Sequence, residues 1–446
     1  MTTQAQLGDK TFTLERFPLD QKNRSLQAWD SADEYLINYV NEHHPDCRSL
    51  LILNDAFGAL ACYFSELTVC SVNDSYISHQ AAAYNLKENK LSTAQFTQLD
   101  SLSALPEEVD LVLIKIPRNV GFLQFQLSEL SEVLAPGTPV IAAGKTKEIH
   151  NSTIKAFEQF IGETKTSLAV KKSRLILSTA KGGYKEANFP VSWQLEGTDF
   201  NITNHANEFS RDSLDIGARF FFNYLPQTSK AKSIIDLGCG NGVVGLMTLS
   251  RCPNASVTFV DESYMAVESA RLNVELNQAN KFDDCQFIEN DCLTGFARDS
   301  VDMVLCNPPF HQAQAVTDHI AWQMFKQAKD TLKEGGELRI IGNRHLDYHD
   351  KLNRMFGNCK LLGSNKRELQ HALKIIEEWS QEWGLPIQPQ KSEHMAFCFS
   401  KTVPDSHNLF FINNTQIPLV DSTTDLGLTI SNSMKWNNHI SRINAK

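Results

Sequence analysis

Short apolar runs alternate with amphipathic segments along most of the chain. Continuous apolar runs are typical of buried strands, and apolar residues at helical spacing are typical of amphipathic helices. The apolar runs predict strands at 234–237, 257–260, 301–306 and 338–341. The helical spacing predicts helices at 243–249, 265–277 and 322–332. Because strands and helices alternate, we expect an α/β fold whose parallel sheet is covered by helices on both faces.

This order of elements occurs twice in the chain. The corresponding segments are 50–58 and 233–242, 72–89 and 260–277, and 109–117 and 301–309. In the second pair, six of eighteen positions are identical at an offset of 188 residues. Such internal repetition indicates a duplicated structural unit. We therefore expect two tandem α/β domains, 1–190 and 191–366, that meet in the stretch 186–200, which contains Pro and Gly.

The pattern changes near residue 367. One amphipathic helix is expected at the start of this segment, followed by a possible strand at 394–400 and a polar stretch rich in turn residues. The segment 367–446 is therefore predicted to be a separate α+β tail.

Composition narrows the class of protein. The 446 residues correspond to about three domains of ~150 residues, and 42% hydrophobic with 21% charged residues is ordinary for a globular chain. No apolar run reaches the ~18 residues of a membrane span, and the N-terminus has no apolar signal region. The ten cysteines form no CxxC pair. We therefore expect a cytoplasmic protein with reduced thiols and without a zinc site.

Charge gives a weaker constraint on partners. Lys and Arg total 42 against 52 Asp and Glu, which gives a net charge of −10. This excess of acidic residues disfavours nonspecific electrostatic binding of nucleic acid. A local basic groove stays open, because net charge does not describe how charges are distributed.

A glycine-rich turn is the first motif with chemical meaning. Segment 236–242 (DLGCGNG) follows a predicted strand and precedes a predicted helix. Glycines there let the backbone pass close to a ligand, and the helix N-terminus presents free N–H groups. About twenty residues later, Asp261 and Glu262 end the next strand, where carboxylates can accept hydrogen bonds from ribose hydroxyls. The alternatives are a plain strand-to-helix turn for the glycines, and a solvated helix cap for Asp261 and Glu262.

A second motif, 307–310 (NPPF), directly follows the strand 301–306. The side-chain oxygen of Asn307 and the carbonyl of Pro308 can accept hydrogen bonds from both N–H groups of an aromatic amine. The prolines stiffen the loop, and Phe310 can stack on the base. Such positioning can supply most of the rate of a methyl transfer to that amine. An Asx-Pro turn without chemistry is the alternative.

Together these motifs resemble the class I S-adenosylmethionine-dependent methyltransferases that act on exocyclic amines. With segment 210–221 (SRDSLDIGARFF) and the duplication, the chain resembles over about 10–366 the 23S ribosomal RNA guanine-N2 methyltransferase G family. The resemblance implies two tandem Rossmann-like class I methyltransferase domains, the first one degenerate. It implies 23S rRNA as the partner, S-adenosylmethionine as the cofactor, no metal and a monomer.

Site residues follow from the resemblance, position by position. The residues that would bind the cofactor are Asp236, Gly238, Gly240, Asn241, Asp261, Glu262 and Asp291. The residues that would hold the target guanine are Asn307, Pro308, Pro309 and Phe310. Phe209, Arg211 and Asp215 could close over the cofactor or serve as a structural cap. The motifs alone also allow guanine in 16S rRNA, adenine in DNA or a protein glutamine as the target.

The first copy has lost both motifs. Its glycine turn reads 54–58 (NDAFG), and its counterpart of NPPF reads 115–118 (KIPR). The resemblance implies that such a degenerate domain recognises RNA. Candidate phosphate contacts are Lys115, Arg118, Lys171 and Lys172, and further candidates are Lys145, Lys147 and Arg174. Ordinary solvated basic residues are an equal alternative at each position.

The tail resembles a different family. Segments 369–397 and 425–446 are similar to reverse transcriptases of the non-LTR retrotransposon type. The residues that carry this resemblance are Leu385, Lys391, Gly427, Trp436 and His439. The aspartate pair of a polymerase is absent, so we expect no polymerase activity and a fusion of two unrelated reading frames. The family pattern has a strand at 360–363 and a final strand after it. The fusion replaces that final strand, so an inactive protein is a further alternative.

Overall fold

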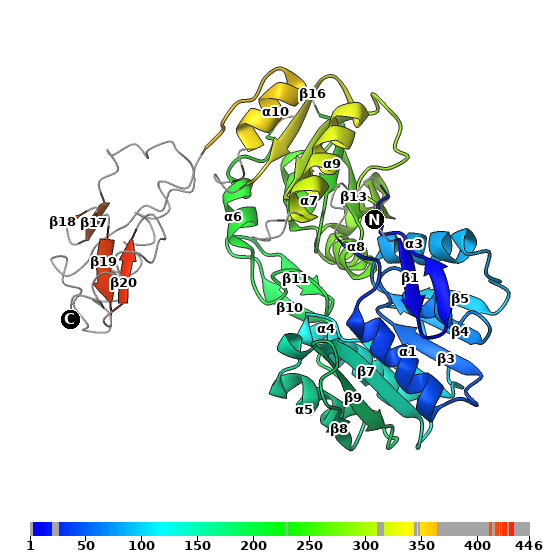
Figure 1. Cartoon of the computed structure of the whole chain (residues 1–446). Helices are drawn as coiled ribbons and strands as arrows, with labels where there is room; N and C mark the ends of the chain where they lie inside the picture. The colour runs from blue at the N-terminus through cyan, green and yellow to red at the C-terminus, as the bar shows by residue number, and fades with distance from the viewer. Residues whose placement is uncertain are drawn as a thin grey trace. The chain divides into compact units, whose positions relative to one another are not determined.

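The structure, a computed structural model, divides into two compact units, Met1–Gly342 and Asn343–Lys446, which are described separately (Figure 1). The residues that it describes are 3–19, 26–227, 231–309, 316–342, 346, 348–363, 410–412, 415–418, 420, 422–425 and 428–431. The first unit contains two large sheets. We call residues 3–190 the N-terminal region and residues 191–342 the second region.

The N-terminal region is built on a seven-stranded sheet of order β5-β4-β3-β6-β7-β9-β8. Its strands are β3 (Ser49–Leu53), β4 (Thr68–Asn73), β5 (Phe96–Asp100), β6 (Leu111–Lys115), β7 (Pro139–Lys145), β8 (Thr164–Thr166) and β9 (Ser173–Thr179). The first five strands pair in parallel, whereas β9 pairs antiparallel with both β7 and β8. A hairpin of β1 (Gln4–Leu7) and β2 (Lys10–Thr13) precedes them.

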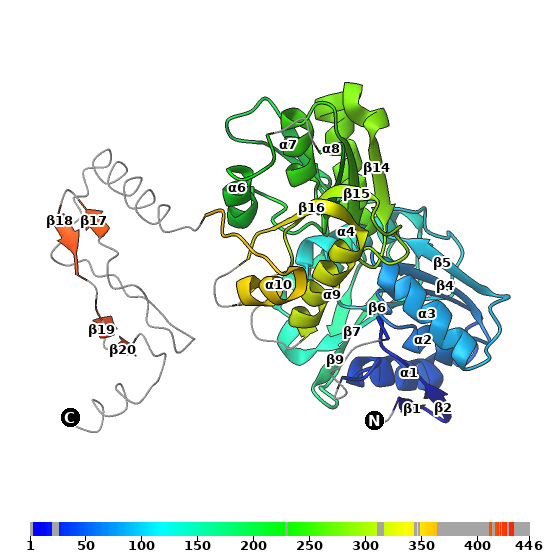
Figure 2. The same cartoon turned by 90° about the horizontal axis from the view of Figure 1, so that it is seen from above.

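Helices cover both faces of this sheet, as the apolar pattern predicts. Alternate residues of a strand point to opposite faces, so the buried strand β3 contributes Leu50 to one core and Leu51 to the other. The first core packs against α1 (Ser31–His43), α2 (Ala59–Tyr63) and α3 (Tyr76–Glu88), which Figure 2 shows together on one side. The second core packs against α4 (Val120–Val133) and α5 (Asn151–Phe160), which follows the short 3₁₀ turn η1 (Thr146–Glu148).

The second region holds a five-stranded parallel sheet of order β14-β13-β12-β15-β16. Its strands are β12 (Ser233–Leu237), β13 (Ser256–Asp261), β14 (Cys285–Glu289), β15 (Val301–Cys306) and β16 (Leu332–Ile340). Its helices are α6 (Ile216–Phe222), α7 (Val243–Arg251), α8 (Tyr264–Gln278), the 3₁₀ helix η2 (Ala279–Asp284) and α9 (Val316–Thr331). A ribbon of β10 (Val191–Gln194) and β11 (Asn201–Asn204) stands where the domain boundary was expected.

The predicted elements of this region are confirmed, with shifted ends. Helix α9 begins and ends earlier than the expected 322–332, and β16 begins at Leu332 rather than at 338. Its pairing with β15 shifts register between Val301 and Met303, because an irregular turn at Gly335 (φ +77°) lies inside the strand. The α/β class with helices on both faces of the sheet holds for the first unit.

The predicted strand at 360–363 is wrong, because these residues are described and have no regular structure. Within the described residues of the first unit, β16 is therefore the last strand at its edge of the sheet, whereas the corresponding strand β7 is followed in its sheet by β9 and β8.

The second unit contains α10 (Tyr348–Phe356) and two hairpins, β17 (Phe410–Ile412) with β18 (Thr415–Ile417) and β19 (Ser422–Asp425) with β20 (Leu428–Ser431).

The tail segment 369–397, the expected strand 394–400, and Gly427, Trp436 and His439 lie outside the described residues. Among the helices that the structure does describe, none has the length and apolar character needed to cross a membrane.

Candidate functional site

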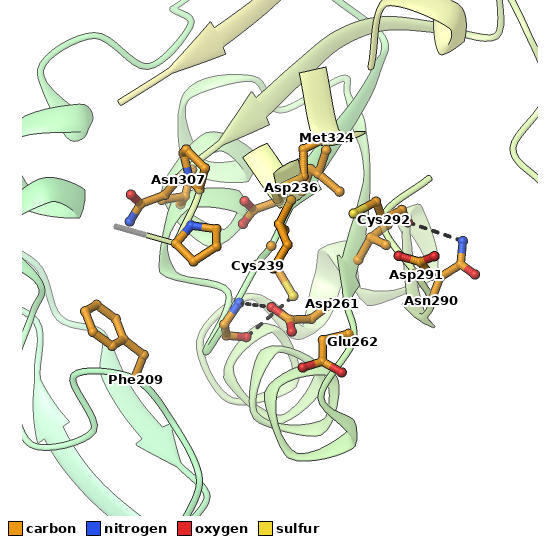
Figure 3. Close-up of a pocket in the computed structure, with 18 of the residues that line it drawn as sticks. Phe209, Asp236, Cys239, Asp261, Glu262, Asn290, Asp291, Cys292, Asn307 and Met324 are labelled. Carbon is orange, nitrogen blue, oxygen red and sulfur yellow. Dashed lines mark hydrogen bonds between the residues drawn. The ribbon is translucent and has the colours of Figure 1, made fainter. Parts of the chain in front are cut away.

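A cavity of about 750 Å³ opens at the carboxyl ends of the strands in the second sheet. In open parallel sheets, ligands bind at this edge, where the strand order reverses direction. The lining comes from the turn after β12, the end of β13, the loops after β14 and β15, and helix α9. Cofactor and substrate residues predicted from separate motifs therefore lie around one cavity (Figure 3).

The glycine turn after β12 needs its glycines for conformational reasons. Gly238, Gly240 and Gly242 have φ of +71°, +51° and +77°, a region that side chains with a Cβ adopt only with strain. At Gly242 an added Cβ would also come within 2.7 Å of the Ala270 side chain, so this glycine lets α7 and α8 pack closely. At Gly240 the nearest atom to an added Cβ, in Glu208, is 3.8 Å away, so this part of the turn is open.

Two of the predicted cofactor carboxylates hold the turn together. Asp236 accepts a hydrogen bond from the backbone N–H of Gly245 (2.7 Å) at the start of α7. Asp261 accepts from the N–H groups of Gly240 (3.0 Å) and Ser263 (3.1 Å). Burial raises the pKa of Asp236 to about 8 and also raises the pKa of Asp261. Both carboxylates therefore shape the turn as well as line the cavity.

Two further carboxylates face the cavity beside them. Glu262 accepts a hydrogen bond from the hydroxyl of Ser75, and burial raises its pKa to about 7. Asp291 accepts from the side chain of Gln323 on α9 (2.9 Å), and its pKa is also raised by burial. Figure 3 shows Glu262 and Asp291 near each other on the β13 and β14 side. This concentration of carboxylates around one cavity favours a ligand that carries positive charge.

Asn307 stands at the end of β15 with an acceptor that has no partner among the described residues. Its side-chain oxygen is buried without a hydrogen bond, whereas its amide nitrogen donates to Asp215 (3.4 Å). A carboxylate only accepts hydrogen bonds, so Asp215 determines which way the amide of Asn307 points. Asp215 also caps α6 by accepting from the N–H of Ala218 (2.9 Å). The sequence suggested a lid or cap for Asp215, but not that it orients Asn307.

The remaining predicted residues are arranged as follows. Pro308, Pro309 and Asn241 line the cavity, and Phe209, which is 62% exposed, lies opposite Asn307 (Figure 3). Arg211 does not line the cavity, because its guanidinium donates to the carbonyl of Ala206 and lies over the ring of Phe189. Phe310 lies outside the described residues.

Comparison with known proteins identifies the family. The RLMG N-terminal domain family matches residues 2–182, and the methyltransferase small domain family matches residues 199–368. The chain is 86% identical over 369 residues to the ribosomal RNA large subunit methyltransferase G of Pseudoalteromonas translucida, covering 82% of this chain and 97% of that one. The chain belongs to the ribosomal RNA large subunit methyltransferase G family. It is an S-adenosylmethionine-dependent methyltransferase.

A more distant member of the family agrees with this assignment, and one solved structure shares the fold. The enzyme of the same name from Klebsiella pneumoniae is 51% identical over 370 residues, covering 82% of this chain and 96% of that one. A T. thermophilus 16S rRNA N2 G1207 methyltransferase, solved in complex with AdoMet and guanosine, has a TM-score of 0.63 at 18% identity. It covers 81% of this chain and 95% of its own, and the likeness establishes a class I Rossmann-like fold with mixed α/β sheets.

A similar left-handed turn follows the central strand β3 of the N-terminal region. Gly58 has the φ of Gly242 (+77°), and Asn54 (φ +66°) stands where the second region has Gly238. The side chain of Asn54 donates to the carbonyl of Lys115 (2.9 Å). The ammonium of Lys115 lies 2.8 Å from Asp30 and 2.7 Å from Asp33.

This geometry corrects the expectation that Lys115 contacts RNA. Its side chain is only 18% exposed, and its charge is neutralised by two carboxylates that the sequence does not place beside it. By contrast, Arg118, Lys171 and Lys172 are exposed, and Lys171 pairs with Glu34 (2.6 Å) at the surface. Those three residues stay predictions as RNA contacts.

Sequence reasoning missed the residues that the N-terminal region contributes to the cavity. These are Arg16, Phe17, Pro18 and Ile77. They precede the glycine turn by more than 150 residues in the chain, and no local pattern marks them. Among the residues that the structure describes, no group of three or more His, Cys, Asp or Glu is arranged to hold a metal ion.

Proposed function

We propose that this chain methylates the N2 amine of a specific guanine in 23S rRNA. The observation that carries the proposal is the side-chain oxygen of Asn307, a residue of the cavity wall. This oxygen is buried without a partner among the described residues, while the amide nitrogen donates to Asp215. An exocyclic amine is a donor that fits this acceptor. Curated relatives of 86% and 51% identity carry the name of the large-subunit enzyme, which supports 23S rRNA as the target.

The residues around the cavity fit S-adenosylmethionine. The open part of the turn at Gly240 would let the cofactor approach the backbone, and Glu262 would accept hydrogen bonds from its ribose. Asp291 would face its adenine. Asp236 and Asp261 would keep the turn in shape beside them, by accepting from the backbone N–H groups of Gly245 and Gly240. When bound, S-adenosylmethionine supplies an electrophilic methyl group on a positively charged sulfur, which the surrounding carboxylates favour electrostatically.

Asn307 and Pro308 would prepare the amine for attack. The amine of guanine is a poor nucleophile because its lone pair is conjugated with the ring. Two acceptors, the Asn307 side chain and the Pro308 carbonyl, would bind its two N–H groups and direct the lone pair toward the methyl group. The base must first leave its helix or be presented in single-stranded RNA. Phe209 at the rim and Phe310 after the prolines are suited to stacking on it.

We further propose that residues 1–190 and 191–366 are tandem copies of one methyltransferase domain, of which the first recognises RNA. Support comes from the shared strand order, in which the central strand, its two neighbours and their outer neighbours occupy equivalent places in both sheets. Exposed Arg118, Lys171 and Lys172 are the proposed phosphate contacts. The enzyme is proposed to act as a monomer in the cytoplasm.

The tail 367–446 is proposed to be a fragment of a non-LTR retrotransposon reverse transcriptase, joined to the enzyme by fusion. The match to the methyltransferase small domain ends at residue 368, which is compatible with a junction near 367. A fragment without the polymerase aspartates would add no activity of its own.

The decisive experiment is transfer of labelled methyl from S-adenosylmethionine to protein-free 23S and 16S rRNA by the 446-residue chain. Label in 23S rRNA alone, recovered as N2-methylguanosine, supports the proposal, and Asn307→Ala should abolish it. Label in 16S rRNA alone would favour the small-subunit target instead. If neither RNA is labelled although the chain binds S-adenosylmethionine, the 23S assignment for this fused chain is wrong.

A further inference from the structure

The two regions of the first unit meet where the corresponding strands β4 and β13 end. Ser75 and Ser263 form an isolated antiparallel bridge between them. The N–H of Tyr76 donates to the carbonyl of Glu262 (2.8 Å), and the N–H of Tyr264 donates to the carbonyl of Asp74 (2.9 Å). The internal repeat pairs Ser75 with Ser263 and Asp74 with Glu262. Equivalent residues of the two regions therefore hold each other by reciprocal bonds.

Asp74 occupies the position that Glu262 has in the second region, but its acceptors are already used. Four donors fill its carboxylate: Ser101 hydroxyl (2.5 Å), Met265 N–H (3.0 Å), Asn207 amide (2.7 Å) and Ser263 hydroxyl (2.6 Å). A carboxylate has about four lone-pair sites, so none is left for a ligand. Three of the donors belong to the second region, and Asp74 is buried. Asp74 therefore fastens the two regions together.

Glu262 has the opposite arrangement. It lines the cavity, and the hydroxyl of Ser75 donates to one of its oxygens from across the boundary. Ile77, two residues after Ser75, lines the same cavity. The segment from Arg16 to Pro18 also borders it, so the N-terminal region provides part of the wall near the ribose carboxylate.

We propose that Ser75, fixed by the bridge at Asp74, is a positioning residue that aims the Glu262 carboxylate at the cofactor. The N-terminal region is then a working part of the cofactor site, beyond any role in RNA recognition. This inference rests on the proposed role of Glu262 in holding the cofactor ribose. The hydroxyl donates to one oxygen of Glu262 and restricts its rotation, which leaves the other oxygen directed to the cavity.

The electrostatics around Glu262 give the inference a distinctive signature. Asp261 on β13, Asp74 after β4 and Asp291 after β14 face Glu262, and their charges oppose its ionisation. Burial is the larger cause of its raised pKa, and the Ser75 hydroxyl lowers that pKa. Removal of the hydroxyl therefore leaves Glu262 protonated up to a higher pH, where it is a poorer acceptor for ribose hydroxyls.

The experiment measures cofactor binding by calorimetry on the full chain. For Ser75→Ala we expect the Kd for S-adenosylmethionine to rise about 10-fold at pH 7, because Glu262 is then more often protonated and less often directed at the ribose. Ser75→Thr keeps the hydroxyl and the cap of α3, so its Kd should stay within about 2-fold of the wild type. As the pH rises from about 6 to about 8, Glu262 ionises and the Kd for the cofactor should fall. In Ser75→Ala this fall should occur at a higher pH than in the wild type.

Asn119→Ala is the matched control. Asn119 also caps a helix of the N-terminal region, and it also reaches the second region, donating to the carbonyl of Ala206 (3.2 Å). It does not contact Glu262, so its loss should leave the Kd for the cofactor and its pH dependence unchanged.

Three results would overturn the inference: cofactor binding unchanged in Ser75→Ala, an equal loss in Asn119→Ala, or no rescue by Ser75→Thr. A melting curve checks that Ser75→Ala is folded. If it is not, the Kd of Ser75→Thr for the cofactor and the pH dependence of the wild-type Kd test the inference. Ser75→Thr must bind the cofactor as the wild type does. Normal cofactor binding by a wild-type chain that labels no 23S rRNA would contradict the proposed target alone.

Discussion

The N-terminal and second regions share a strand order, but the cavity described above opens at the strand ends of the second region. Both have a left-handed turn after the central strand, with Gly58 and Gly242 at the same φ of +77°. In the N-terminal region, the residue that replaces Asn307 is Lys115, and it is locked between Asp30 and Asp33. In the second region Asn307 keeps an unpaired oxygen. Similar backbone arrangements therefore carry different side chains at the ends of β6 and β15, and these side chains decide which polar groups are left for a ligand.

The same contrast appears at the ends of β4 and β13. Asp74 has four donors and serves as a fastener, whereas Glu262 has a donor from Ser75 and faces the cavity. Corresponding positions in the two sheets thus have different uses, which the number of filled acceptor sites distinguishes.

The largest effect should follow from breaking the buried ion pairs of the N-terminal region. Lys115→Met leaves Asp30 and the buried Asp33 without their counter-charge, which should lower the free energy of unfolding by about 3–5 kcal/mol. Urea unfolding of the full chain measures it. Arg118→Met, at an exposed position, should change stability by less than about 0.5 kcal/mol. An equal free energy of unfolding for the two variants would contradict the stabilising role of the ion pairs between Lys115 and the carboxylates of Asp30 and Asp33.

Asn307→Ala tests the open site directly. It removes the acceptor for the target amine, so kcat for 23S rRNA should fall by about 100- to 1,000-fold. The Kd for S-adenosylmethionine should not change, because Asn307 holds the substrate side of the cavity. A variant that retains more than about a tenth of the wild-type kcat would contradict the role of this oxygen.

Asp215→Ser separates the two tasks of Asp215. Serine is a good helix cap, so the start of α6 should be retained, but its shorter side chain does not reach Asn307. With the amide free to turn, kcat should fall about 10-fold at saturating cofactor. Melting temperature and cofactor affinity serve as controls and should match the wild type. A changed KM for the cofactor with a normal kcat would show that Asp215 acts on the cofactor side of the cavity. That result would contradict its role in orienting Asn307.

A separate effect concerns the pH dependence of stability. Burial raises the folded-state pKa of Asp236 from 3.8 to about 8, so its stabilising contribution is fully present below about pH 4 and is lost as pH rises toward 8. Asp236→Asn keeps the oxygen that accepts from Gly245 and cannot ionise. The fall in melting temperature between about pH 5 and pH 8 should therefore be shallower in Asp236→Asn. Parallel curves for variant and wild type would contradict the raised pKa.

Much of the fold and of the candidate site was predictable from local sequence. Apolar runs located the strands around 234–237, 257–260 and 301–306, because a buried strand needs neighbouring apolar residues. The strand at 360–363 failed, since strand formation there needs a partner in the sheet and no residue pattern guarantees one.

The sequence by itself determined the glycine turn, the Asn-Pro-Pro motif and the repeat, because turn conformation and periodicity depend on residues close in the chain. Tertiary structure alone decided that Lys115 pairs with Asp30, 85 residues away, and that Asp74 binds Met265, 191 residues away. It also brought Ile77 into the cavity of the second region. Such contacts depend on how distant segments cross in the fold, and the free energy of a buried charge depends on which donors those crossings supply.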